Sequence, residues 1–231
     1  MVIENKNRFF LGSGLLITFF IVLILVFLPI FNGKNGLEFL DNLYNSISKG
    51  SAYYIPKVLK DIEEYKGTKV NVTFTLKSKN DHQIKLIHNL FSKTAEVNIS
   101  GQSFTVNGDL GKILAHSIED TDKMYKNEGK AVSGKYGGAD EKEILYTWYE
   151  TFHLMDKELK KQRKFSQARI LNQVLEKCVE PSYNFYKIEP QRISDKVGIV
   201  FFSLVFYVIY TIWFGFAIMY LFEGFGFKFG H

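Results

Sequence analysis

The sequence has a single cysteine, Cys178, and this scarcity excludes several kinds of protein. One thiol cannot form an internal disulfide or the paired cysteines of a haem-attachment motif. The chain also lacks the Gly-x-Ser-x-Gly and His-Glu-x-x-His patterns of many hydrolases and zinc proteases. Because Cys178 falls on the apolar face of a predicted helix, we interpret it as a small buried hydrophobic residue. We expect no cofactor and no catalytic activity.

Charged residues are missing altogether from two long windows, residues 9–31 and residues 197–222. Each window is longer than the roughly 20 apolar residues that span a hydrocarbon core. The chain after Pro29 offers no small-x-small cleavage site, so the first window predicts an uncleaved signal anchor and not a cleaved signal peptide. Both windows therefore predict transmembrane helices, with the lipid bilayer as a partner.

Basic residues in the two short tails, residues 1–8 and 223–231, predict the orientation. Lys6 and Arg8 precede the first apolar window. The segment between the windows, residues 32–196, is much longer than about 60 residues, so its own charges have little influence on translocation. We expect cytoplasmic tails and an extracytoplasmic domain, in a two-pass protein of the inner (cytoplasmic) cell membrane. That domain is only weakly basic, which argues against a nucleic acid as its partner.

The first half of the domain combines helical and strand patterns. Apolar residues recur at helical spacing over residues 37–47 and again from Pro56 to Gly67. Strict alternation over residues 69–76 predicts a strand, and Asp81 can begin a helix. Residues 97–106 alternate on both sides of Gly101-Gln102, which predicts a β-hairpin.

The sequence pattern in the second half of the domain predicts helices. Residues 109–127 form one, a glycine-rich loop follows over residues 129–138, and a long helix runs from Asp140 to Lys164. A further helix over residues 166–179 should pack antiparallel to the long one, before the tract 180–190 breaks it. The fold class is therefore an α+β extramembrane domain, with a small antiparallel sheet and several helices, between two transmembrane helices.

The aromatic residues of that last tract leave two interpretations open. Tyr183, Phe185 and Tyr186 lie just before the second apolar window. They could belong to an aromatic belt at the membrane interface. They could equally pack beneath the domain.

One segment imitates a nucleotide-binding motif. Gly129-Lys-Ala-Val-Ser-Gly134-Lys135-Tyr136 has the glycine and lysine spacing of a phosphate-binding P-loop. It ends in tyrosine where a P-loop has the Ser or Thr that binds magnesium. The preceding residues, 122–128, are polar, whereas a buried strand should precede a P-loop. We expect a flexible interhelical loop without bound nucleotide.

Two groups of residues imitate metal sites. Glu150 and His153 form a Glu-x-x-His pair, which is half of a di-iron carboxylate site. No second such pair exists, and both residues fall outside the apolar stripe around Trp148, so we expect them to face solvent. His116, with Glu119 and Asp120, carries the reverse order on another helix. We expect no metal site.

A cluster of positive charge lies at the end of the predicted long helix. Cations near a helix C-terminus are favoured by the helix dipole, so a solvated face is one interpretation. Contact with acidic lipid headgroups or an acidic partner is the other. The cluster comprises Lys157, Lys160, Lys161, Arg163 and Lys164.

Small and polar residues recur every four positions in the second apolar window: Ser203, Tyr207, Thr211 and Gly215. Such a stripe predicts contact with another helix. In an antiparallel pair, Gly14 and Thr18 of the first window would lie at the depth of Thr211 and Gly215, which predicts an intramolecular contact there. Ser203 and Tyr207 then remain for a neighbouring subunit or a second copy of the chain.

The sequence therefore favours a non-catalytic accessory or scaffold subunit of a larger membrane assembly. An extracytoplasmic sensor acting through a separate partner is an alternative. The layout, with Pro181 and Pro190 before the second window, also looks similar to that of polysaccharide chain-length regulators, which implies an oligomeric membrane protein. Those proteins usually place a strand soon after the first span, where Leu37 and Pro56 here indicate helices.

Overall fold

The computed structural model describes residues 3–76 and 80–227, and the chain divides into two compact units. One unit contains both ends of the chain, up to residue 47 and from residue 191. The other comprises residues 48–190 and is built from helices and one small sheet. The mixed helix-and-sheet class expected from the sequence is confirmed.

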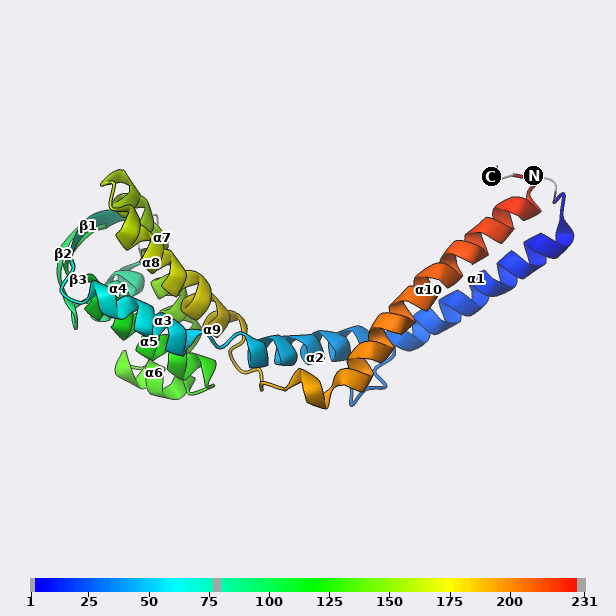
Figure 1. The fold of residues 1–231 in the computed structure, drawn as a ribbon, viewed down its shortest axis with the longest axis horizontal. Helices are drawn as coiled ribbons and strands as arrows, with labels where there is room; N and C mark the ends of the chain where they lie inside the picture. The colour runs from blue at the N-terminus through cyan, green and yellow to red at the C-terminus, as the bar shows by residue number, and fades with distance from the viewer. Residues whose placement is uncertain (1–2, 77–79, 228–231) are drawn as a thin grey trace. The chain divides into compact units, whose positions relative to one another are not determined.

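Two long apolar helices, α1 (Lys6–Phe27) and α10 (Val197–Gly224), lie side by side and run antiparallel (Figure 1). Both are long and apolar enough to cross a membrane, with mean hydropathies of 2.8 and 2.2. Helix α1 begins earlier than expected because the Asn5 side chain caps it by accepting a hydrogen bond from the Arg8 N–H. It ends at Phe27, shortly before the helix-breaking Pro29.

The contact between α1 and α10 repeats every seven residues. On α10, Ala217 and Gly224 are buried seven residues apart, and Tyr210, seven residues earlier, stacks on Phe19 of α1. Ser203, a further seven residues back, is buried with its hydroxyl beside that of Tyr44. On α1, Gly12 and Phe19 are the buried residues, also seven apart. A seven-residue repeat keeps one seam of each helix against its partner, as in a left-handed coiled coil.

The first unit also contains the start of α2 (Gly36–Ser51) and a single turn, η3 (Ile193–Asp195). An ion pair of 3.4 Å between Arg8 and Glu223 joins α1 to the end of α10. Helix α2 confirms the helix expected after the first apolar window, and it continues to Ser51.

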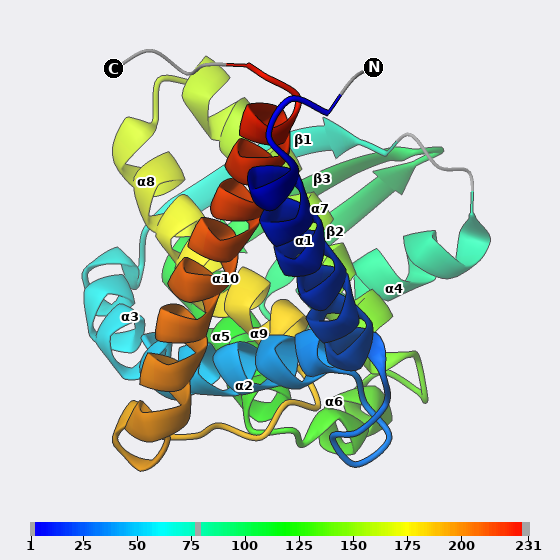
Figure 2. The ribbon, with the colours of Figure 1, turned by 90° about the vertical axis from the view of Figure 1, so that its right-hand side faces the viewer.

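The second unit has a three-stranded antiparallel sheet in the order β1-β3-β2, with β3 in the middle (Figure 2). The expected strand and hairpin are confirmed as β1 (Lys69–Thr75), β2 (Ala95–Ser100) and β3 (Ser103–Asp109). Every second side chain of β1 is buried, so the sheet presents one face to the helices.

The helices of this unit surround one hydrophobic core, in which Trp148 is fully buried against Phe91 and Phe152. The expected pairing of the two long helices is present, since α7 packs along α8. The helices of the second unit are α3 (Ile55–Asp61), η1 (Ile62–Tyr65), α4 (Asp81–Phe91), α5 (Leu110–Tyr125), α6 (Gly129–Lys135), α7 (Glu141–Lys161), α8 (Phe165–Val174), η2 (Leu175–Val179) and α9 (Glu180–Asn184).

The flexible loop expected over residues 129–138 is a short helix, α6. Its Val132 is fully buried in the core, and its last residue and Tyr136 are held by polar contacts described below. Gly137 and Gly138 follow with φ of +70° and +87°, a conformation that glycine adopts without strain. The expectation failed because glycine only weakens a helix, and burial offsets that cost.

The helix expected to break at residue 180 continues through Pro181. A π-helical turn over Leu175–Val179 shifts the hydrogen-bond pattern, and the Glu180 N–H donates to the Leu175 carbonyl. Pro181 lacks an N–H, and this shift occurs immediately before it. The turn also keeps Cys178 in the core.

Candidate functional site

The most polar part of the core is centred on Asp120 of α5, whose side chain is fully buried. Its Oδ1 accepts a hydrogen bond of 2.7 Å from the Lys135 ammonium. Its Oδ2 accepts from the Tyr136 hydroxyl at 2.5 Å and from the Trp148 indole N–H at 3.0 Å. Three helices, α5, α6 and α7, are thereby joined through one carboxylate.

His116, one turn before Asp120, completes this Asp120 cluster. Its Nε2 lies 3.0 Å from the Tyr136 hydroxyl and its Nδ1 lies 3.4 Å from the Lys135 ammonium. Burial, followed by the nearby charge of Lys135, lowers the pKa of His116, which favours the neutral imidazole. Burial and the adjacent Asp120 carboxylate raise the pKa of the Tyr136 phenol, which therefore stays protonated.

The cluster accounts for the segment that imitates a P-loop. Lys135, the residue that would bind a phosphate, is held by Asp120 and is only 16% exposed. Tyr136, in place of the magnesium-binding hydroxyl, is buried against the same carboxylate. Residues 129–136 thus supply a cation and a phenol to the core, and the lysine is already paired.

A second buried cation, Lys49, lies at the end of α2 in the domain unit and is only 1% exposed. Its ammonium donates to Asn127 Oδ1 at 2.9 Å and to the carbonyls of Phe185 and Ile188 at 3.1 and 2.6 Å. All three of its protons therefore have acceptors. Burial lowers the pKa of Lys49. The residue joins the beginning of the domain unit to its end.

The aromatic residues near the end of the domain unit pack against its core. Tyr186 is 8% exposed, and its hydroxyl donates to Glu141 Oε1 at 3.1 Å. Tyr183 and Phe185 are partly buried on the same core. The sequence left two interpretations open, an aromatic belt at the membrane interface and packing beneath the domain. The contacts of these three residues agree with packing beneath the domain.

Three further residues that the sequence singled out, Glu150, His153 and Cys178, are half-buried or buried in the domain unit. Glu150 is half-buried and accepts a 2.6 Å hydrogen bond from Gln83, so it does not simply face solvent. His153 is half-buried against Tyr149. Cys178 is fully buried, and burial raises its pKa to about 12, so its thiol stays protonated.

The basic cluster lies at the end of α7 and in the turn after it. Lys160 pairs with Asp156 at 2.7 Å, and Lys161 pairs with Glu158 at 2.6 Å. Within residues 3–76 and 80–227, no salt bridge involves the other three cations. These are Lys157, Arg163 and Lys164.

The four residues predicted to form one stripe on α10 do not share one environment. Ser203 is buried, with its Oγ 2.7 Å from the Tyr44 hydroxyl of α2, so it belongs to the protein's own packing. Tyr207 is 69% exposed, and Thr211 and Gly215 are exposed as well. A Cβ at Gly215 would have no atom within 4 Å.

The intramolecular role expected for Gly14 and Thr18 falls to other residues of α1. A Cβ at Gly14 would have no neighbour within 4 Å, and the Thr18 hydroxyl donates to the Gly14 carbonyl of its own helix. A Cβ at Gly12, in contrast, would lie 2.6 Å from the backbone nitrogen of Leu221. The two helices therefore approach each other closely at Gly12.

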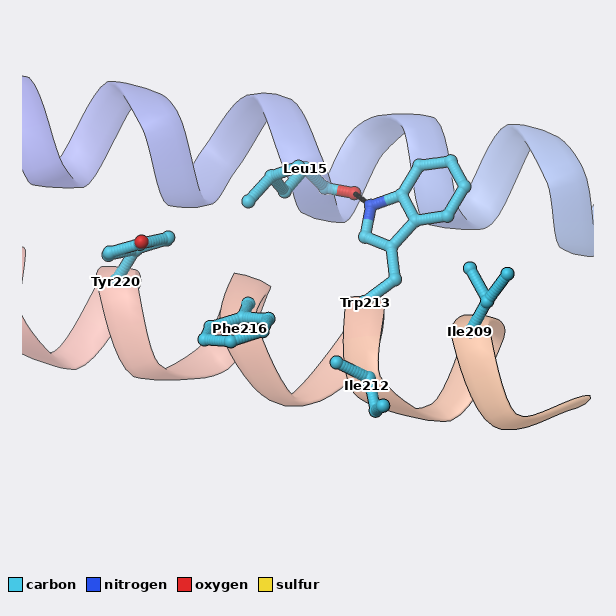
Figure 3. A pocket seen from close by; sticks show the side chains of 6 residues that line it. All are labelled: Leu15, Ile209, Ile212, Trp213, Phe216 and Tyr220. Carbon is cyan, nitrogen blue, oxygen red and sulfur yellow. Dashed lines mark hydrogen bonds between the residues drawn. The ribbon is translucent and has the colours of Figure 1, made fainter.

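Polar side chains of α10 reinforce this contact. The Trp213 indole N–H donates to the Leu15 carbonyl at 3.1 Å, beside a shallow apolar hollow (Figure 3). The Tyr210 hydroxyl donates to the Phe19 carbonyl at 3.1 Å, and its ring stacks on the Phe19 ring at 4.2 Å. Both donors are therefore satisfied within an otherwise apolar helix pair.

Two polar clusters and one helix pair are thus the distinctive features of the chain. Among the described residues, no group of three or more His, Cys, Asp or Glu side chains could hold a metal ion. No family model, curated protein or solved structure matches this chain.

Proposed function

We propose that the chain is a two-pass, non-catalytic membrane subunit that holds its α+β domain outside the cytoplasm and acts as a scaffold within a larger assembly. The observation that carries the proposal is the outer face of α10. Tyr207, Thr211 and Gly215 are exposed there, and none of them is needed for the contact with α1. Small and polar residues on an apolar helix let a second helix approach closely.

The polar clusters of the domain support a structural role. Both oxygens of the Asp120 carboxylate are engaged, and all three protons of the Lys49 ammonium are donated. Groups that are saturated inside the protein hold helices in place. A domain fixed in this way is suited to presenting a surface to a partner.

Gly215→Leu should release the partner while the chain itself persists. The added side chain meets no atom of its own helix pair but occupies the surface where a second helix would pack. Co-purification in mild detergent, with quantification of associated proteins and of second copies of the chain, should show a loss of severalfold in whatever is bound to the native chain.

Gly14→Leu is the matched control, since it adds the same side chain to α1 at an equally open position. It should retain the partner. If Gly215→Leu, also combined with Tyr207→Ala, leaves every association of the native chain intact, the proposed interface on α10 is refuted.

A further inference from the structure

Two hollows adjoin one another in the unit that contains α1, the start of α2 and α10. One is an almost entirely apolar groove of about 440 Å³, lined by residues such as Val26, Leu37 and Phe206. The other is a pocket of about 530 Å³ with both polar and apolar walls. Phe31, Phe39 and Ile199 line both, so the groove and the pocket share a wall. Together they form an amphipathic site.

The pocket carries two cations without an acidic partner. Lys34 follows the end of α1 and Lys196 precedes the first residue of α10, and both line the pocket. Neither takes part in a salt bridge within the part of the chain that the structure describes. Asp195 also lines the pocket, and one of its oxygens accepts a 3.0 Å hydrogen bond from Ser194.

Gln191 forms part of the wall of the same pocket. The Gln191 backbone N–H donates to the Ser46 carbonyl at 3.0 Å and so fixes the wall. The Gln191 side-chain Oε1 is buried and accepts no hydrogen bond from any described residue.

We infer that this site binds one anionic phospholipid, with the phosphate between Lys34 and Lys196 and an acyl chain in the apolar groove. Both lysines flank the ends of the apolar helices, where headgroups lie if α1 and α10 span the bilayer. The inference rests on the proposed membrane insertion.

The test is native mass spectrometry of the full chain in detergent with equal amounts of dioleoyl phosphatidylglycerol and dioleoyl phosphatidylcholine. The native chain should retain one phosphatidylglycerol in preference to phosphatidylcholine. Lys34→Gln with Lys196→Gln should reduce that preference roughly tenfold, because each lysine near an anionic headgroup contributes to the attraction. Lys157→Gln with Lys164→Gln removes the same charge from the basic cluster of the domain unit and should leave the preference unchanged.

The outcomes separate the alternatives. If Lys157→Gln with Lys164→Gln abolishes the preference for phosphatidylglycerol and Lys34→Gln with Lys196→Gln does not, lipid binding belongs to the basic cluster and the inference is overturned. Displacement of the lipid by soluble glycerol phosphate at an equal concentration would indicate a simple anion site and would also overturn it. A chain that stays in the membrane fraction but shows no lipid preference refutes only this site. A chain recovered in the soluble fraction refutes the proposed function and the lipid site together.

Discussion

Asp120→Asn is expected to destabilise the domain by about 3–5 kcal/mol, the usual cost of removing one partner of a buried ion pair. The substitution keeps the size of the side chain but leaves the Lys135 ammonium with only the exposed Glu119 carboxylate, 3.4 Å away, as a compensating charge. It also offers one acceptor oxygen in place of two, for three donors that now share the carboxylate. Thermal unfolding followed by Trp148 fluorescence, in a Trp213→Phe background, measures the loss beside the mutated residue.

Glu119→Gln is the matched control, because it makes the same change at the neighbouring position. Glu119 is 53% exposed and pairs with Lys123 at 2.8 Å and, at the longer distance of 3.4 Å, with Lys135, so the loss should stay below about 1 kcal/mol. Lys135→Met should cost less in the Asp120→Asn background than in the native chain, which a double-mutant cycle resolves. Equal losses for the two carboxylates would mean that Asp120 is not the centre of a buried cluster.

The same cluster predicts how stability varies with pH. Because the pKa of His116 is lowered in the folded state, the unfolded chain binds more protons as the pH falls below about 6.5, the ordinary pKa of histidine. The contribution of this residue to stability is therefore complete above that pH and is lost on acidification. His116→Gln should flatten the decrease in unfolding temperature between pH 7.5 and 5.5 relative to the native chain.

Gly12→Ala should destabilise the α1–α10 pair, whereas Gly14→Ala should leave it unchanged or stabilise it. The added Cβ at Gly12 would lie 2.6 Å from the Leu221 backbone nitrogen and 3.0 Å from the Ala217 carbonyl oxygen. Backbone atoms cannot move aside without separating the helices, and overpacking costs about 1–3 kcal/mol. At Gly14 the space is open, and alanine is the better helix former by about 1 kcal/mol.

The opposite signs make this comparison decisive, since both variants carry the same substitution in one helix. The measurement is the fraction of chain that remains monodisperse after heating in detergent. A second pair repeats the design on α10: the Cβ added by Gly224→Ala would lie 2.7 Å from the Phe9 Cα, and the Cβ added by Gly215→Ala would have no atom within 4 Å. Equal behaviour of Gly12→Ala and Gly14→Ala would contradict the close approach at Gly12.

Local sequence patterns were sufficient for most elements of the fold. Strict alternation from Val70 to Phe74 specifies a strand with one buried face, and the Gly101-Gln102 turn fixes the hairpin that follows. The uncharged windows specify α1 and α10 without reference to anything else in the chain. In each case neighbouring residues alone determine the pattern.

The interhelical contact could not be derived in the same way, because two spacings compete on α10. Small and polar residues recur every four positions from Ser203 to Gly215, and every seven from Ser203 to Gly224. Only the second spacing stays on one side of a supercoiled helix over its whole length. Ser203 belongs to both series, and it was expected to face a neighbouring subunit because Gly14 and Thr18 were matched with Thr211 and Gly215.

The buried polar clusters depend on contacts that are distant in the sequence. Asp120 falls within the apolar stripe of α5, between Ser117 and Met124, and a carboxylate in that position was the signal for a buried partner. Its cation lies 15 residues away on a segment expected to be a loop. Lys49 shows no such signal, since the acceptors of its ammonium are side-chain and backbone oxygens at residues 127, 185 and 188.

The sidedness of the two-helix arrangement is tested most directly by labelling single introduced cysteines with a membrane-impermeant maleimide on spheroplasts. The native Cys178 is fully buried and its pKa is raised to about 12, so it gives little background. Lys157→Cys in the domain should be labelled while the membrane is intact, and Asn7→Cys in α1 should be labelled only after the membrane is opened. Labelling of Asn7→Cys on intact spheroplasts, with protection of Lys157→Cys, would contradict an extracytoplasmic domain held between two membrane-spanning helices.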